Sequence, residues 1–282
     1  MIDLKKLIDS ANNLAPLPAS TVRLAQMVSS SNCDLGEVSE LIAFDQGLTM
    51  SLLRGANSAA SGGAMVVSTV QEAVSRLGLA RVLALAVASG ARPFLSGKLE
   101  AYQLDEGALW RHSVASAVAA EVIPGYCEVE IPSEVFTAAI LHDVGKLVMS
   151  RFLDPEIIGY IRRAQEVDGL PRLEAESMLL GVHHGELGGL IAQHWALPHR
   201  VVQGIIHHHH PEQGGDVVCD ATYLANIVGN HIEACFAGKD LELLVESGVC
   251  ERLGVTQANL QALCPIAAAR FAQVSNRYNA AA

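Results

Sequence analysis

Imidazole and carboxylate side chains gather in the second half of the sequence, where they could bind a metal ion. His142 is followed directly by Asp143, and ten of the eleven histidines lie before residue 211. Imidazole nitrogen and carboxylate oxygen are ligands that a divalent transition metal accepts. Adjacent helical residues project about 100° apart, so this pair can face one ion only if the ion lies close to the helix. We therefore expect other helices to complete such a site.

The residues around this pair predict a buried helix. The apolar side chains fall on one helical stripe: Phe136, Ile140, Val144, Leu147 and Val148. Ser133 is a suitable N-cap for this helix. His142 and Asp143 would then lie inside it, where an unpaired charge is strongly destabilising. Both residues should therefore be paired, hydrogen-bonded or metal-bound.

Each histidine taken alone has a simpler interpretation than metal binding. An isolated imidazole is more often a buried, hydrogen-bonded side chain or, for His194, His199 and His231, an ordinary surface residue. The run from His207 to His210 is internal and precedes Pro211. We therefore interpret it as native and not as a purification tag.

Composition and charge limit the classes of function. The 282 residues are half apolar, with 19 Lys plus Arg against 30 Asp plus Glu and a net charge of -11. No basic run could neutralise the phosphates of a duplex, which disfavours nucleic-acid binding. The most hydrophobic stretches, such as Val82 to Ala91, are about half the ~20 residues of a membrane span, and the N-terminus has no signal-peptide pattern. Six scattered cysteines without a CxxC pair indicate reduced thiols, so we expect a cytoplasmic protein without membrane contact.

The chain reads as a succession of helices with short breaks. No segment alternates with period two and no internal repeat is present, which predicts an all-α fold. Asp34 with Glu37, and Ser68 with Gln71, are expected to begin two of the helices. Gly78 can end the second of them.

A polar stretch that begins at Ser96-Gly97-Lys98 is the best boundary between two lobes. We predict an N-terminal helical lobe at residues 1–97 and a larger helical lobe, with all the histidines, at residues 98–282. The small residues 59–64 can lie close against another surface, so we expect the N-terminal lobe to form one wall of a cleft with the histidine-bearing helices. The alternative is that this segment only packs two helices tightly.

The order of these motifs resembles the HD superfamily of metal-dependent phosphohydrolases, and most closely its HD-related output domain branch, HDOD. His112 is followed by His142-Asp143 with Gly145-Lys146, then by His184, and then by His208-His209. Further segments over nearly the whole chain are similar to family signatures: Leu14–Ala19, Leu52–Ser58, Val70–Val74 with Leu77-Gly78, Leu109–Ser113, His184–Gly188 and Trp195–Pro198. The resemblance implies a multi-helical HD-like bundle with an additional N-terminal helical lobe.

The resemblance also implies a metal site, position by position. The family's first metal is held by residues that correspond here to His112, His142, Asp143 and Asn226. An asparagine offers only a neutral oxygen where the family has an aspartate, so a hard cation should be held less tightly. Asp220, six residues earlier, lies off the same helical face. The second-metal histidines of binuclear members correspond to His184, His208 and His209. We expect a divalent transition metal (Fe, Mn, Zn or Ni) at partial occupancy.

Two functions follow from the resemblance. We favour a non-catalytic signal-transduction output module that acts through a signalling protein or a small ligand, because a fold alone does not give chemistry. The alternative is a metal-dependent phosphohydrolase, in which Asp143 and Lys146 would be catalytic. No Gly-Tyr-Pro segment follows the histidine run, so we expect no turnover of cyclic dinucleotides. A helical scaffold with hydrogen-bonded core histidines is the third interpretation.

Overall fold

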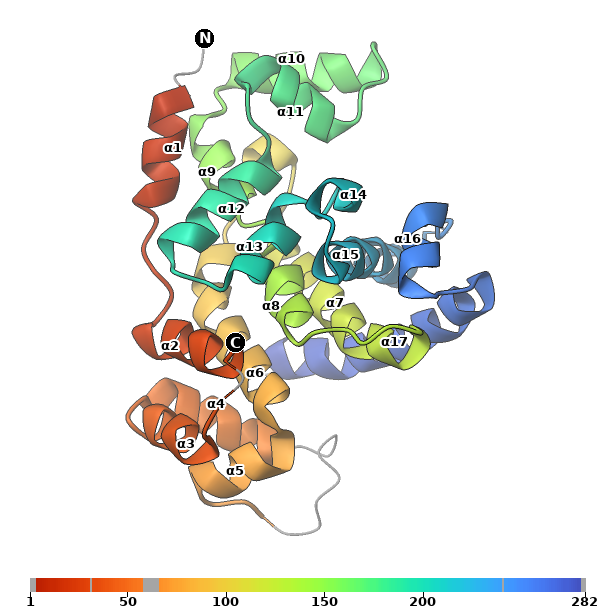
Figure 1. The fold of residues 1–282 in the computed structure, drawn as a ribbon. Coiled ribbons are helices and arrows are strands. Elements are labelled where there is room, and N and C mark those ends of the chain that lie inside the picture. The colour runs from red at the N-terminus through yellow and green to blue at the C-terminus, as the bar shows by residue number, and fades with distance from the viewer. Residues whose placement is uncertain (1–3, 31, 58–65, 240, 280–282) are drawn as a thin grey trace. The chain divides into compact units, whose positions relative to one another are not determined.

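The computed structural model describes residues 4–30, 32–57, 66–239 and 241–279, and these residues form helices and no strand (Figure 1). An isolated antiparallel bridge pairs Leu99 with Leu104. The prediction of an all-α fold is confirmed. Within the described ranges no single helix has the length and hydropathy of a membrane span; only the pair Val70–Leu77 and Leu79–Leu95, bent by 110°, passes that test jointly.

The chain divides into two compact units that differ in part from the predicted lobes. The larger unit comprises Met1–Leu14, Phe94–His194 and His199–Ala282, and the smaller one Ala15–Pro93 and Trp195–Pro198. The predicted lobe 1–97 therefore loses its first helix, α1 (Leu4–Asn12), to the larger unit. The physical reason is that α1, with Leu7 and Ala11 fully buried, packs on α9 (Gly145–Phe152) and α12 (His184–His194).

The smaller unit contains five helices among its described residues: α2 (Ala19–Val28), α3 (Leu35–Ala43), α4 (Gln46–Ala56), α5 (Val70–Leu77) and most of α6 (Leu79–Leu95). Asp34 accepts hydrogen bonds from two backbone N–H groups in the first turn of α3, at 2.6 and 3.1 Å, so this N-cap is confirmed. The predicted start of α5 is wrong by one residue. Thr69 and Glu72 form the capping box, whereas Ser68 and Gln71 have the same spacing but lie one position too early.

The segment between α4 and α5 was expected to pack on another surface. Residues 59–64 lie outside the described residues. On the described flanks, the Asn57 side chain accepts from the backbone N–H of Val67 and donates to its carbonyl, both at 2.7 Å. Asn57 therefore holds the two ends of this segment together. Gly78 ends α5 with a φ of 75°, as predicted.

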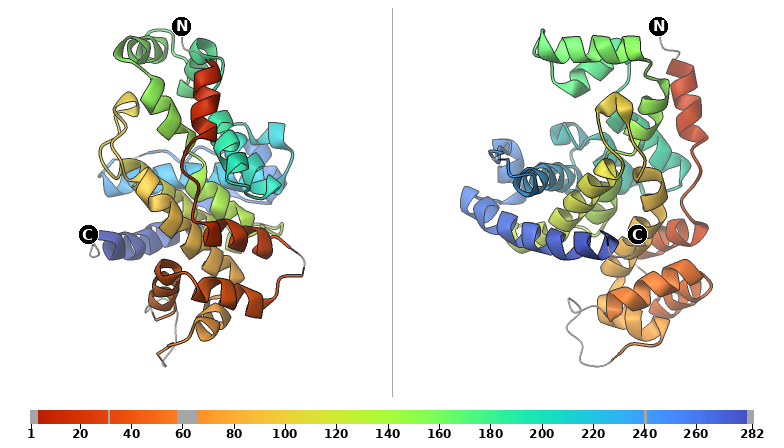
Figure 2. Two further views of the ribbon diagram at one scale, coloured as in Figure 1. Left: turned by 90° about the vertical axis from the view of Figure 1, so that its left-hand side faces the viewer. Right: turned by 180° about the vertical axis from the view of Figure 1, so that it is seen from behind.

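The core of the larger unit is built on α7 (Ala108–Val122) and α15 (Val217–Phe236). Gly229 permits their close approach, because a Cβ there would lie 2.9 Å from the backbone nitrogen of Ser116. Helix α8 (Glu134–Leu141) packs on both of them, and α17 (Gln257–Asn279) packs mainly on α7 (Figure 2). The remaining helices are η2 (Glu100–Tyr102), η3 (Ile123–Tyr126), α10 (Pro155–Glu166), α11 (Arg172–Leu180), α13 (His199–Ile206), α14 (Pro211–Gly214) and α16 (Ser247–Leu253).

The predicted continuous helix through His142 and Asp143 is wrong. Helix α8 ends at Leu141, a turn covers residues 142–144, and α9 begins at Gly145. Hydrogen bonds of the tighter i+3 type, from Val144 N to Leu141 O and from Lys146 N to Asp143 O, shape this turn. The apolar stripe continues through the turn, so periodicity could not reveal it. Ser133 is the N-cap residue, but its side chain makes no capping hydrogen bond.

Candidate metal centre

Six side chains from four segments of the larger unit converge on one buried cluster. His112 lies in α7, His142 and Asp143 in the turn after α8, His184 begins α12, and the last two follow α13: His208 and His209. They form two groups, in each of which the candidate ligand atoms lie within 4.8 Å of one another. We call them the three-histidine half, with His184, His208 and His209, and the His112 half, with His112, His142 and Asp143. The structure thus brings together all six residues named from the sequence.

Asp143 lies between the two halves, and each of its carboxylate oxygens faces one of them. Its Oδ1 is 3.4 Å from His184 Nε2 and 3.8 Å from His208 Nε2. Its Oδ2 is 3.4 Å from His142 Nε2 and 2.6 Å from the ammonium of Lys146. The two oxygens therefore differ in chemistry, because only Oδ2 has a cation beside it.

The imidazoles are oriented by hydrogen bonds on their outer nitrogens. His142 Nδ1 lies 2.7 Å from the carbonyl of Ala139, and His208 Nδ1 lies 2.7 Å from that of Ile205. Both carbonyls belong to the last turn of a helix, where no intrahelical N–H is available to them. Since a carbonyl only accepts, each Nδ1 carries the proton. Each Nε2 is then left with a lone pair that points into the cluster.

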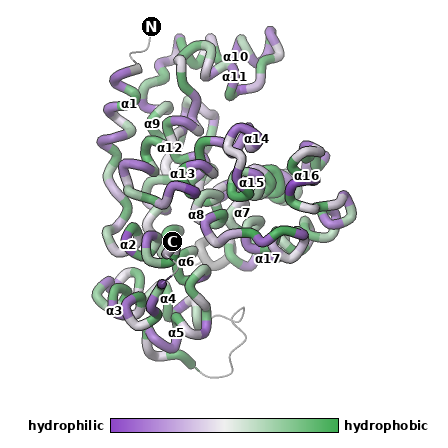
Figure 3. Tube along the Cα trace, in the orientation of Figure 1, coloured by the Kyte–Doolittle hydropathy of each residue, from purple (hydrophilic) through white to green (hydrophobic). Residues whose placement is uncertain are grey.

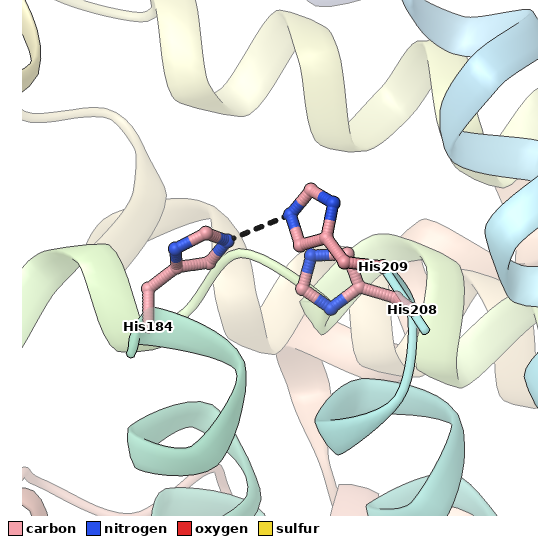
Figure 4. Close-up of side chains that lie close together, drawn as sticks. All are labelled: His184, His208 and His209. Carbon is pink, nitrogen blue, oxygen red and sulfur yellow. Dashed lines mark hydrogen bonds between the residues drawn. The ribbon is translucent and has the colours of Figure 1, made fainter. Parts of the chain in front are cut away.

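Two acceptor atoms that face the interior of the three-histidine half lack donors. His208 Nε2 and Asp143 Oδ1 are buried and have no hydrogen-bond partner. Figure 4 shows the hydrogen bond between the Nε2 atoms of His184 and His209, which lie 3.0 Å apart. Buried acceptors of this kind are destabilising unless a donor or a cation satisfies them. Three imidazole nitrogens and one carboxylate oxygen suit a transition-metal ion, so the residues present fit such a group.

Burial and neighbouring charges keep His208, His209 and Asp143 in the form that binds metal. Burial lowers the pKa of His208 well below its usual value, and together with His184 it lowers the pKa of His209 to about 2. For Asp143, burial alone would raise the pKa, but Lys146 and His142 hold it well below its usual range. At neutral pH, His208 and His209 are thus neutral imidazoles beside an ionised Asp143 carboxylate, as metal ligation requires.

In the His112 half, both ring nitrogens of His112 have hydrogen-bond partners within the protein. His112 Nδ1 lies 3.1 Å from a carboxylate oxygen of Glu233, and its Nε2 lies 3.0 Å from Asn226 Oδ1 and 3.1 Å from His142 Nε2. Asn226 Oδ1 also accepts a hydrogen bond from Asn230 at 3.1 Å. The neutral amide that replaces the family's carboxylate thus lies beside His112, where the ligand was expected.

Asp220 does not replace the missing carboxylate. Its side chain forms two-pronged hydrogen bonds with the guanidinium of Arg252, at 2.5 to 3.1 Å. The sequence-based doubt about Asp220 is therefore confirmed. The His112 half has the ammonium of Lys146 on the shared carboxylate and an amide in place of an anionic ligand, so it is the weaker of the two halves for a cation.

Sequence reasoning missed two carboxylates that contact the cluster from outside. Glu233 lies seven residues after Asn226 on α15, and this spacing, which places both on one helical face, could have revealed it. Glu176 contacts His184 from α11. Nothing in the local sequence around Glu176 indicates this contact, because it depends on how α11 packs.

Comparisons with known proteins assign the chain to a family. The family model for the HDOD domain matches residues 14–211. The chain belongs to the HDOD family. The resemblance inferred from the motif order is confirmed. The HDOD match includes the smaller unit and the part of the larger unit that lies within residues 14–211.

Solved structures share the fold. A crystal structure of an HDOD domain protein of unknown function from Geobacter sulfurreducens is 22% identical, with a TM-score of 0.70, and covers 95% of this chain and 98% of its own. A candidate phosphohydrolase from Shewanella amazonensis is 26% identical, with a TM-score of 0.61 and coverages of 88% and 93%. A candidate signal transduction protein from Marinobacter aquaeolei is 20% identical, with a TM-score of 0.70, and covers 94% of this chain and 59% of its own.

One sequence relative is a longer protein. An uncharacterized protein of Treponema pallidum is 24% identical over 204 residues, which is 72% of this chain and 39% of that protein. The aligned region thus spans about two fifths of that relative's length.

Proposed function

We propose that this HDOD protein is a non-catalytic output module of signal transduction, and that its three-histidine half holds one divalent transition-metal ion. It would act through contacts with a signalling protein or a small ligand, and a net charge of -11 speaks against nucleic acid as the partner. One observation carries the metal proposal. Asp143 Oδ1 and His208 Nε2 are buried without partners, and they face the imidazoles of His184 and His209.

Two features of the His112 half support the absence of catalysis. Asn226 supplies an amide at the place of the family's distal carboxylate, and it accepts from Asn230. Lys146 lies on Asp143 Oδ2, the oxygen that would face an ion bound beside His112 and His142. Both features reduce the negative charge that would hold a metal in this half.

A metal-dependent phosphohydrolase is the second candidate. It is favoured by the convergence of all six family positions and by the similarity to a candidate phosphohydrolase of known structure. A bound ion would supply a hydroxide nucleophile and polarise a phosphoryl oxygen. In that case Asp143 would hold the ion, and Lys146 would offset negative charge on the phosphoryl group.

Metal analysis and a hydrolysis screen test the proposal together. Protein purified without added metal is dialysed against Fe, Mn, Zn or Ni and assayed on phosphomonoesters, phosphodiesters, and cyclic mono- and dinucleotides. Variants His142→Ala and Asp143→Ala are compared with His194→Ala, which changes an exposed histidine of α12 as a matched control. We expect at most one ion per chain, retained by the His194→Ala control and lost in Asp143→Ala. The wild-type protein should hydrolyse the substrates no faster than His142→Ala and Asp143→Ala do.

Two outcomes would contradict this. Metal-dependent hydrolysis that disappears in both His142→Ala and Asp143→Ala, and persists in the control, would establish the enzyme. Failure of the wild-type protein to take up any of the four metals would leave a helical scaffold with hydrogen-bonded histidines.

A further inference from the structure

Glu176 is a fully buried carboxylate that accepts four hydrogen bonds from its neighbours. Its Oε2 accepts from the ring Nδ1 of His184 at 2.7 Å and from the backbone N–H of His184 at 3.0 Å. Its Oε1 accepts from the hydroxyl of Tyr102 at 2.9 Å and from Nε of Arg172 at 3.2 Å. The carboxylate is thus anchored at both oxygens and cannot turn away from His184.

This anchoring determines which nitrogen of His184 carries the proton. An ionised carboxylate only accepts, so Nδ1 of His184 must be the N–H and its Nε2 must keep the lone pair. That Nε2 is the atom that faces His209 and Asp143 Oδ1. A carboxylate behind a ligand histidine also makes the imidazole a stronger donor to a metal.

We propose that Glu176 is the positioning residue of the metal site, and that through it occupancy of the site is coupled to α11. The inference rests on the proposed function in requiring that the three-histidine half binds an ion. Glu176 does not contact that ion. It holds His184 in the tautomer and orientation that bind, and it does so from a different helix, so that a displacement of α11 changes the affinity of the site.

The coupling to α11 follows from where the anchors come from. Arg172, also on α11, donates to the carbonyl of Ala101 at 2.8 Å, and its guanidinium lies 4.0 Å from the ring centre of Tyr102. The network therefore ties α11 to both η2 and the first residue of α12. The coupling between two binding events is reciprocal. An ion bound by His184 must therefore also stabilise the position of α11, and a molecule that stabilises α11 must raise the affinity for the ion.

Helices α10 and α11 form a helical hairpin whose outer face is exposed and partly apolar. Helices α10 and α11 pack on each other at one end of the larger unit (Figures 1 and 2). Along α10 the hydropathy alternates (Figure 3), with Ile161 buried and Tyr160 53% exposed. On α11, Met178 is 61% exposed, two residues after the buried Glu176. A displacement of α11 that moves Glu176 at the metal site would therefore also move exposed side chains such as Met178.

The test compares Glu176→Gln with Glu174→Gln, an exposed glutamate two residues earlier on α11. A glutamine side chain can donate as well as accept, so it no longer imposes one tautomer on His184. In the metal-free proteins, nitrogen–proton NMR of the ring reads the tautomer. We expect the Nδ1–H form alone in wild type and Glu174→Gln, and both forms in Glu176→Gln. A protein with a merely structural Glu176 would not show this change.

Two measurements with Co²⁺ as the probe complete the experiment. We expect its affinity to fall by about 10- to 100-fold in Glu176→Gln and to stay unchanged in Glu174→Gln. Hydrogen exchange of residues 155–180 should slow on Co²⁺ addition in wild type, and much less in Glu176→Gln at the same occupancy. The Nδ1–H form alone in Glu176→Gln, with unchanged affinity and unchanged protection, would overturn the positioning role. Absence of Co²⁺ binding by wild type would overturn the proposed metal site instead, while the tautomer measurement would still decide the role of Glu176.

Discussion

Gly145 tests whether the close contact between α9 and α12 builds the metal site. The glycine lies directly after the His142–Val144 turn, and its Cα faces the backbone at the start of α12. A Cβ added at Gly145 would lie 1.9 Å from the carbonyl oxygen of His184 and 2.7 Å from the backbone nitrogen of Gly188. Both neighbours are backbone atoms, which cannot turn aside as the end of a side chain can.

The size of the effect follows from these distances. Cβ atoms essentially never lie within 3.0 Å of such neighbours, so Gly145→Ala must separate α9 from α12 by at least 1.1 Å (3.0 minus 1.9). Overpacking typically costs about 1–3 kcal/mol in the free energy of unfolding, and a clash with backbone atoms should lie at the upper end of that range. The same displacement would lengthen the 3.4 Å separation between His184 Nε2 and Asp143 Oδ1, and so weaken metal binding.

Gly159 provides a control with the same chemical change and the opposite sign. It is exposed in the middle of α10, and a Cβ there would meet nothing within 4 Å. Gly159→Ala should raise the free energy of unfolding by about 0.5–1 kcal/mol, because alanine favours the helix over glycine. Urea denaturation gives both values, and Co²⁺ titration of the folded proteins gives the affinity. A Gly145→Ala protein within 0.5 kcal/mol of wild type and with unchanged Co²⁺ affinity would refute the reasoning.

Three further predictions concern charge and protonation. Asn226→Asp should raise the Mn²⁺ affinity of the His112 half about tenfold, because a carboxylate binds a hard cation better than an amide; calorimetry that shows no gain in Mn²⁺ binding would contradict this. The pKa of Glu176 is lowered from 4.5 to about 2: burial alone would raise it, but the interaction with His184 and the hydrogen bonds from His184 and Tyr102 more than offset that. Its contribution of about 3 kcal/mol to folding is therefore present above pH 4.5 and lost towards pH 2, so the stability difference between wild type and Glu176→Gln should shrink over that range and not stay constant. Burial raises the pKa of the Cys127, Cys219 and Cys264 thiols to about 11, which leaves on the order of 0.1% thiolate at pH 8. Iodoacetamide should therefore not modify them in the folded protein, and mass spectrometry that finds them alkylated would contradict this.

Local patterns in the sequence were sufficient for the class of fold, and the resemblance to the HDOD family supplied the members of the cluster. The absence of period-two alternation predicted helices, and Asp34 has the side chain and position of the N-cap that it forms. The order of His112, His142-Asp143, His184 and His208-His209 predicted the HDOD family. These features depend on residue types and short spacings, which the sequence states directly.

Other features were decided only by packing between distant segments. The turn at His142–Val144 interrupts an apolar stripe that continues unbroken, so no helical period could reveal it. The difference between the two oxygens of Asp143 depends on where Lys146 places its ammonium. Glu176 reaches His184 only because α11 packs beside η2 and the start of α12.

The physical reason is the range of the interactions. Helix propensity, capping and apolar periodicity act over a few residues, so they can be read from neighbours in the sequence. The tautomer of a histidine, the partner of a carboxylate and the approach of two backbones are determined by atoms that only the folded chain brings within about 3 Å. The sequence alone therefore determined which residues meet in the cluster, and the tertiary structure decided how they are oriented and which half suits a cation.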